Sequence, residues 1–527
     1  MAGYAVLYGR AWTDEATYIV KAWWYINGLM PPYSDRDATW YMPLFFYQLG
    51  LFEKVFGTSL EAGRTMSAVI GGLSGGLLFL ICRRLTGNAA VALLTTAIYL
   101  LTPTTAYYFA TAAPLATVAC LTLLAVWLIL IAAPPGVGVS AALGLTFWAL
   151  FFYRQNMILA VGLLAPLYIF AIGRKRVLHT AIVAGVSLAA SIATLLLFPA
   201  KLGHYAARLP GVVPILDTLH MLPRDFQLIQ TATDSAALLR IDLASLSWEN
   251  FAISFLLPYL GTIVLALLAP FASRKLGAIF AAAFFTLAIT HFIGSAGYCS
   301  TCALMYTNYF VGVGAVDGAL VLVAVWQACR ARALPAMPAV VLMAAAAIGL
   351  NAFGSLIRVS AQPNPYRLFP EPMLHQYQPV REAVEIEQFA QVIAGITPAD
   401  KPVLVLHTQP ALAYAVFRAG RQPAVQSLNI RQSFRELRPD LDPLTRNDVL
   451  KAVAGESLWT RETLQQWLNG GFDTIVLQEG SGIADYPTAA ALELAFDLRT
   501  RAIFLGWSVA IYTRKPTPGV DEPAPTP

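Results

Sequence analysis

The chain has 527 residues, of which 57% are hydrophobic and 12% charged, with a formal net charge of +5 and a mean hydropathy of +0.61. Soluble domains carry roughly 25% charged residues, so this composition excludes a disordered chain, a collagen, a coiled coil and a small disulfide scaffold. It also argues against a nucleic-acid binder, because the net charge is small and no block of Lys or Arg lies on a polar face.

Ten apolar segments are long enough, or nearly so, to cross a bilayer, which takes about 20 residues. The predicted spans are 66–82, 89–109, 113–132, 138–153, 156–172, 178–198, 252–272, 276–294, 304–326 and 335–357. The fold class predicted is therefore a polytopic α-helical membrane protein with a C-terminal soluble α/β domain.

The basic residues of the short loops predict the orientation of these spans. One set of alternate loops holds nine Lys and Arg, whereas the opposite set holds only Arg154. By the positive-inside rule, residues 1–65, the loop 199–250 and the tail 358–527 lie on the non-cytoplasmic side. Residues 1–9 are too short to span and have no basic n-region, so they are not a signal peptide. We favour a missing first helix, which would give eleven spans.

The segment 11–65 is the least membrane-like part of the first half of the chain. It holds half of the twelve acids of residues 1–357 and four of the eleven Trp. Thr13 can N-cap a helix from Asp14 to about Gly28, whose aromatic residues suit the membrane interface. A second surface helix is predicted at 43–56. Acids in the first turn of a helix complement its dipole, so Asp14 and Glu15 need no further role by themselves.

Four motifs follow one another in this segment: WTDEATYI at 12–19, GLMPPY at 28–33, YMPLFFY at 41–47 and LFEKVFG at 51–57. In this order and spacing they resemble the first external loop of polytopic GT-C glycosyltransferases, a superfamily that includes the protein O-mannosyltransferases and the lipid A aminoarabinose transferase. The resemblance covers about residues 8–90. Beyond them it rests on the pattern of spans, external loops and an external C-terminal domain.

The resemblance implies an integral-membrane enzyme that moves a sugar from a polyprenyl-phosphate-linked donor to a glycan, lipid or protein acceptor. The transfer takes place with inversion on the non-cytoplasmic side, and the expected location is the bacterial inner membrane. Asp14 matches the family's loop acid, which acts as general base on the acceptor hydroxyl or helps bind a divalent metal in some members. Glu15 would tune Asp14 or bind the sugar.

Two departures from the family pattern concern the second acid. The family's Pro-Pro-Leu reads Met-Pro-Leu at 42–44, and the stretch 111–117, where many relatives carry an acid, has none. Asp35 or Asp37 would substitute for it. No metal-binding residue is assigned, and a divalent metal is left open as the only cofactor considered.

The donor phosphate needs cationic partners near the external interface. Arg154 is the main candidate. A role in phosphate binding and a role as a snorkelling side chain that anchors the helix end are about equally favoured for it. The further candidate binding residues are Tyr41, Arg64, Lys201, His204 and Arg208, although an anchoring role is favoured for Arg64 and a solvated face for each residue of the long loop.

Two features inside the spans and their loops are read as structural. Asp317 has small neighbours, which favours a structural hydrogen bond over catalysis. Cys299 and Cys302 form a CxxC in an external loop and are predicted to make a structural disulfide.

The predicted domains follow from these segments. They are the external loop 1–65 with its interfacial helices, the membrane region 66–357, a Pro-rich linker 358–375, an α/β domain 376–515 and a disordered tail 516–527. Strands are predicted at 403–406, 474–477 and 507–512, and helices at 379–394, 409–419, 460–469 and 486–500.

Three other functions compete with this reading. A transporter or flippase predicts broken, charged helices near the midplane and a repeat between halves, of which only Asp317 is present. An oligosaccharide ligase or polymerase would centre on the loop 199–250. A non-enzymatic scaffold would tolerate neutral residues at the acids of 11–65.

Overall fold

The computed structural model describes most of the membrane region and parts of the C-terminal domain. The residues described are 13–29, 43–131, 136–154, 157–171, 176–197, 251–296, 305–361, 377–406, 411–424, 472–479, 492–493 and 495–515. They form two compact units. One unit, here called the membrane unit, contains the described residues from 43 to 361. The other, here called the C-terminal unit, contains helix α2 (Thr13–Ile26) together with residues 377–515.

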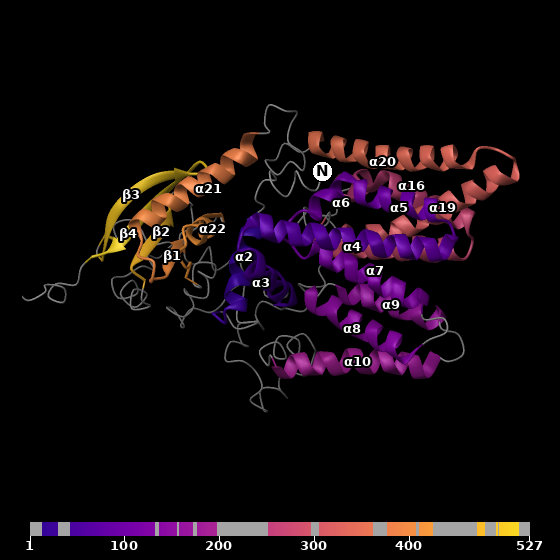
Figure 1. The fold of residues 1–527 in the computed structure, drawn as a ribbon, viewed down its shortest axis with the longest axis horizontal. Helices are drawn as coiled ribbons and strands as arrows, with labels where there is room; N and C mark the ends of the chain where they lie inside the picture. The colour runs from indigo at the N-terminus through magenta and orange to yellow at the C-terminus, as the bar shows by residue number, and fades with distance from the viewer. Residues whose placement is uncertain are drawn as a thin grey trace, which may run out of the picture. The chain divides into compact units, whose positions relative to one another are not determined.

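The membrane unit is built from helices that run side by side (Figure 1). Its helices are α3 (Pro43–Phe56), α4 (Leu60–Thr86), α5 (Ala89–Leu101), α6 (Pro103–Tyr108), α7 (Leu115–Ile131), α8 (Val137–Tyr153), α9 (Ile158–Ala171), α10 (Arg176–Leu197), η4 (Ala252–Leu256), η5 (Leu257–Tyr259), α16 (Leu260–Ala272), α17 (Leu276–Ala296), α19 (Val311–Ala331) and α20 (Ala336–Ala361). Each of the ten predicted spans coincides with one of these helices or with two or three that follow one another in sequence.

Among the described residues, four helices are long and apolar enough to cross a membrane by length and composition. They lie at Leu60–Thr86, Val177–Leu197, Val311–Ala331 and Ala336–Ile357. Shorter apolar helices accompany them, such as Val137–Tyr153. Large apolar side chains exposed on α10 and α20, including Leu196 and Leu342, are suited to contact with lipid chains.

Local signals explain where these helices begin and end. Gly87 ends α4 with a positive φ of 66°, and its N–H donates to the Arg83 carbonyl. Asn88 then begins α5, because its side chain accepts hydrogen bonds from the N–H groups of Ala90 and Val91. This Gly-Asn pair makes a tight connection between two antiparallel helices.

Glycines allow α20 to pack closely against the start of α16. A Cβ at Gly261 would collide with the Ala347 carbonyl, and a Cβ at Gly354 would collide with the Leu257 carbonyl. Asn351, on the same face of α20, accepts hydrogen bonds from the N–H groups of Gly261 (2.7 Å) and Thr262 (3.2 Å). The first N–H groups of a helix have no partner within it, so Asn351 satisfies two of them where water is scarce.

Asp317 lies in α19 with its side chain fully buried. Neither carboxyl oxygen has a hydrogen-bond partner among the residues that the structure describes. The structural hydrogen bond predicted for Asp317 is therefore not found in that part of the chain. Its neighbours Gly314 and Gly318 do face other helices closely, as the sequence indicated.

In its described residues, the C-terminal unit contains a four-stranded sheet and three helices. The helices besides α2 are α21 (Tyr377–Ile396) and α22 (Ala411–Arg418). The strands are β1 (Val403–Leu406), β2 (Thr474–Gln478), β3 (Phe496–Phe504) and β4 (Trp507–Arg514). The strand order is β1-β2-β4-β3, with β1 and β2 parallel and the other pairs antiparallel. The three predicted strands are confirmed.

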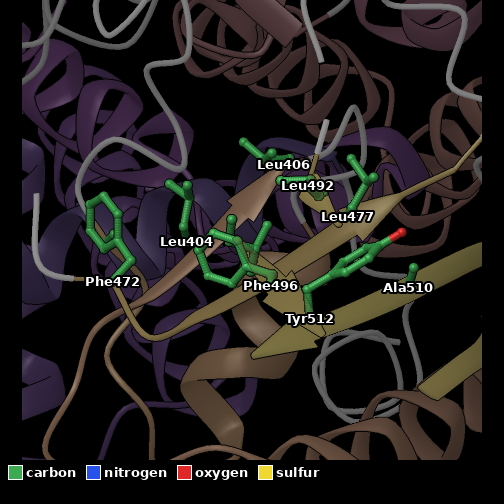
Figure 2. Close-up of a cluster of buried hydrophobic side chains, with 10 residues drawn as sticks. Leu404, Leu406, Phe472, Leu477, Leu492, Phe496, Ala510 and Tyr512 are labelled. Atoms are coloured by element: carbon green, nitrogen blue, oxygen red, sulfur yellow. The ribbon is translucent and has the colours of Figure 1, made fainter. Parts of the chain in front are cut away.

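The register of the sheet places its apolar residues in one layer. Leu404 pairs with Ile475, Leu406 with Leu477 and Leu477 with Ala510. Because alternate residues face the same side of a strand, these side chains share one face and pack with Phe472, Leu492, Phe496 and Tyr512 (Figure 2). Residues of the other face of β1 and β2, such as Val405 and Val476, are buried as well.

One predicted helix is wrong in its second half. Residues 496–500, assigned to a helix at 486–500, belong to strand β3, which forms a hairpin with β4. Leu505 (φ 49°) and Gly506 (φ 82°) make the turn, and two successive positive φ angles match the twist of a β-hairpin. The pairing with β4 outweighs the weak local preference of these residues for a helix. The predicted helix 460–469 lies outside the described residues.

Candidate active site

Asp14, the residue predicted to be the catalytic acid, lies at the start of α2 in the C-terminal unit. Asp14 lies in the first turn of α2, and its side chain lies outside the description. Glu15, the next residue, is fully buried, as is Lys21 in the same helix. The sequence predicts a helix that lies in the membrane interface here, but every described side chain from Glu15 to Val20 is buried in the protein.

Helix α2 is tied to the C-terminal domain by its aromatic residues. It packs against α22, and the ring of Trp23 meets the ring of Phe417 edge-on, with 5.2 Å between the ring centroids. Edge-on aromatic pairs stabilise a contact by about 1 kcal/mol beyond the area that they bury. The helix that carries Asp14 is thus built into a domain that follows it by almost 400 residues.

The predicted binding residue Arg154 is placed at the end of α8. It is the C-cap of that helix, with its N–H bonded to the Leu150 carbonyl. Its guanidinium lies over the ring of Tyr306, 5.5 Å from the centroid, which is the geometry of a cation–π contact. The ring of Tyr306 in turn stacks on the ring of Tyr309, with 5.7 Å between the centroids. The positive charge of Arg154 also interacts electrostatically with the Tyr309 hydroxyl.

A second set of polar groups lies beside Arg154, where α3 crosses the ends of the spans. Gln48 of α3 accepts a hydrogen bond from the Tyr153 hydroxyl at 2.6 Å. Its amide nitrogen donates to the Thr117 hydroxyl at 3.2 Å and lies 3.8 Å from the sulfur of Met66. We call Gln48, Thr117, Tyr153, Arg154, Tyr306 and Tyr309 the polar cluster.

Sequence reasoning found Arg154 but missed the rest of the polar cluster. Gln48 lies in a segment dominated by apolar and aromatic residues, where a single amide gives little signal. Thr117 ends the stretch 111–117, which stands out in the sequence only because it lacks the acid that many relatives carry there. The weak available signal was an amide within an otherwise apolar helix, because a buried amide requires hydrogen-bond partners.

Glu53 is a buried acid of α3 to which the sequence analysis gave no role. It lies on the buried face of α3 and is 2% exposed. Burial raises the pKa of its carboxyl to about 9, because desolvation disfavours the charged form. Neither oxygen has a hydrogen-bond partner among the described residues, which also favours the neutral form of this carboxyl.

The other predicted site residues are placed as follows. Arg64 lies near the start of α4 and is 4% exposed, which does not fit a freely snorkelling side chain. Asp35, Asp37, Tyr41, Lys201, His204 and Arg208 lie outside the described residues, and so do Cys299 and Cys302. Asp14 and Arg154 belong to different compact units and are described separately.

The described part of the chain contains no group of three or more His, Cys, Asp or Glu side chains able to hold a metal ion. Asp35 and Asp37 lie outside the described residues.

Comparison with known proteins leads to a class of enzyme. Residues 39–200 match the family of dolichyl-phosphate-mannose-protein mannosyltransferases. No curated protein sequence matches the chain significantly. The matched segment contains α3 and the helices up to α10, so it includes Gln48, Thr117, Tyr153 and Arg154 of the polar cluster.

Comparison with solved structures extends the likeness to almost the whole chain. The fold is similar to ArnT from Cupriavidus metallidurans bound to undecaprenyl phosphate, with a TM-score of 0.54 and 13% identity over 97% of this chain and 95% of ArnT. It is also similar to the same protein in the apo state, with a TM-score of 0.53 and 12% identity over 95% and 93%. The GT-C fold expected from the sequence is confirmed. Together the two comparisons give a segment that matches a family of glycosyltransferases and a fold similar to that of ArnT.

Proposed function

We propose that the protein transfers a sugar from a polyprenyl-phosphate donor to a hydroxyl of a glycan, lipid or protein acceptor on the non-cytoplasmic side of the membrane. The observation that supports this most directly is the position of Arg154. It is a cation at the end of a membrane helix, set against tyrosines in a segment that matches a glycosyltransferase family. The nine-against-one distribution of basic residues in the loops supports a location of this end of the helices outside the cytoplasm.

The reaction then follows from two residues. Asp14 removes the proton of the acceptor hydroxyl as its oxygen bonds to the anomeric carbon of the sugar. The bond between that carbon and the donor phosphate oxygen breaks, and the electron pair leaves with the polyprenyl phosphate. Arg154 offsets the negative charge that develops on the phosphate. Attack opposite the leaving group inverts the anomeric centre, and Glu15 acts on the sugar or on Asp14.

Sugar transfer in membranes tests this proposal. Membranes come from cells that lack the gene and carry the wild type, Asp14→Asn or Arg154→Ala at matched expression. We expect Asp14→Asn to lower transfer by at least about 100-fold, the usual contribution of a general base. Glu61→Gln and Lys54→Ala change exposed charges of the same region and should leave transfer unchanged. Wild-type activity of Asp14→Asn would place the base elsewhere, and a wild type without transfer would favour the flippase or scaffold.

Labelling tests the orientation. A single cysteine at Lys54 should react with a membrane-impermeant reagent in intact cells, whereas one at Arg332 should react only after the membrane is opened. Both positions are exposed in the structure. The reverse pattern would overturn the non-cytoplasmic location of the site.

A further inference from the structure

Gln48 joins its own helix to three other helices of the membrane unit. Its two amide atoms reach side chains of α4, α7 and α8, namely Met66, Thr117 and Tyr153. These helices come from distant parts of the sequence, and Gln48 itself lies on the short helix α3. A side-chain amide in an apolar setting is costly unless both of its ends are bonded, so this arrangement defines one position of α3 on the three spans.

The strongest of these contacts acts on the residue next to Arg154. The Tyr153 hydroxyl donates to the Gln48 amide oxygen at 2.6 Å, the short end of the range for a hydroxyl donor. Tyr153 is the last residue of α8, and Arg154 is its C-cap. Holding the Tyr153 ring therefore holds the last turn of the helix, from which the Arg154 side chain extends over Tyr306.

The backbone alone does not fix Arg154 as firmly. Its N–H is bonded to the Leu150 carbonyl and its own carbonyl accepts from the Met157 N–H at 3.0 Å, so these bonds link residues close in sequence. The last turn of a helix frays unless side chains anchor it to other elements. Tyr153 and Gln48 provide such an anchor across a separation of 105 residues.

We propose that Gln48 is a positioning residue for the binding of the donor phosphate: it holds Tyr153 and thereby sets Arg154 in place. This inference rests on the proposed role of Arg154. Gln48 acts through Tyr153 and does not touch the substrate. Loss of the Gln48–Tyr153 bond should weaken phosphate binding and leave the chemical step nearly unchanged.

The experiment measures the binding of undecaprenyl phosphate to the purified full-length protein in nanodiscs, together with KM and kcat for transfer. The variants are Gln48→Leu, Tyr153→Phe, the double variant and Arg154→Ala. Tyr153→Phe removes one oxygen atom and keeps the ring. The matched control is Thr194→Val. In the wild type the Trp148 ring nitrogen, also on α8, donates a 3.0 Å hydrogen bond to the Thr194 hydroxyl, and the substitution removes this acceptor.

Gln48→Leu and Tyr153→Phe should each raise Kd and KM by about 5- to 20-fold with kcat within twofold, and Thr194→Val should match the wild type. The double variant should be no worse than either single variant, because both remove the same bond. If Arg154→Ala weakens binding but Gln48→Leu and Tyr153→Phe do not, the inference is overturned and the proposed function stands. The same conclusion follows if the effects of Gln48→Leu and Tyr153→Phe add in the double variant. If Arg154→Ala binds like the wild type, the phosphate site itself is elsewhere and both proposals for Arg154 are overturned.

Discussion

In the membrane unit, buried and half-buried polar side chains bond to one another across helices, whereas around the sheet of the C-terminal unit the described ion pairs lie at the surface. Asn351 and Gln48 each join several helices through short hydrogen bonds. In contrast, Arg418 and Glu387 form an exposed pair at 3.0 Å, and Arg501 and Glu479 form another at 3.1 Å. The core of this unit's sheet consists of buried apolar side chains that pack on one another.

The difference follows from the solvent around each unit. Within a bilayer no water replaces a lost hydrogen bond, so polar groups must find partners in the protein, and each partner fixes a helix position. At a water-exposed surface an ion pair gains little, because water solvates both charges. Polar substitutions should therefore matter most in the membrane unit, and the following predictions test that from the largest effect to the smallest.

Asn351→Leu should have the largest effect on stability. It leaves two buried N–H groups at the start of α16 without an acceptor and removes bonds to the Thr102 and Thr262 hydroxyls. Each unsatisfied buried group costs about 1–3 kcal/mol, so we expect a loss of about 4 kcal/mol. Thermal unfolding in detergent measures it. Thr104→Val, which removes a single 3.2 Å bond to Ser355, is the milder control; equal shifts for both variants would contradict the role of Asn351.

Glu53→Gln should stabilise the membrane unit at neutral pH. The pKa of Glu53 is raised from 4.5 to about 9, so the folded protein binds a proton that the unfolded chain releases. Stability contributed by that proton is fully present below pH 4.5 and is lost as the pH rises toward 9. At pH 7 the cost is roughly 3 kcal/mol, from 1.36 kcal/mol per pH unit. Tm measured from pH 5 to 9 should fall for the wild type and stay flatter for Glu53→Gln; parallel curves would show that Glu53 is not protonated.

Phe417→Leu should lower catalysis although it lies far from Asp14 in the sequence. It loosens the contact with Trp23, and displacement of a catalytic group by even 1 Å slows reactions severely. We expect kcat to fall about 5- to 10-fold, with the binding of undecaprenyl phosphate unchanged. Phe389→Leu, which alters a contact with Phe504 elsewhere in the same unit, is the control. A similar loss in both variants would mean that the domain is destabilised as a whole.

Glu479→Gln should have the smallest effect. The hydrogen bond from Ser508, and then the pairing with Arg501, hold the pKa of Glu479 below its usual value. A lowered pKa stabilises the folded state above pH 4.5, and that contribution is lost as the pH falls through the lowered value. Because the pair is largely exposed, the loss at pH 7 should stay below about 1 kcal/mol, measured by hydrogen exchange of β2 and β4. A larger loss would remove the contrast between the two units.

The sequence predicted much of the secondary structure. The ten spans, the helix at 43–56 and the strands β1, β2 and β4 follow from runs of apolar residues and their periodicity. Such signals depend on neighbours in sequence, which is why they can be read without a structure. The GT-C resemblance of residues 8–90 came from the order of local motifs, and the fold comparison supports it.

The sequence also determined that Arg154 stands alone in its loop, but only the tertiary structure decided what surrounds it. Gln48, Tyr153 and Tyr306 lie next to one another because helices from distant parts of the chain end at the same place. The same reason explains β3, which is a strand because β4 pairs with it, and the burial of α2, which packs on a domain nearly 400 residues later. Contacts of this kind depend on how elements pack, and no local pattern of residues records them.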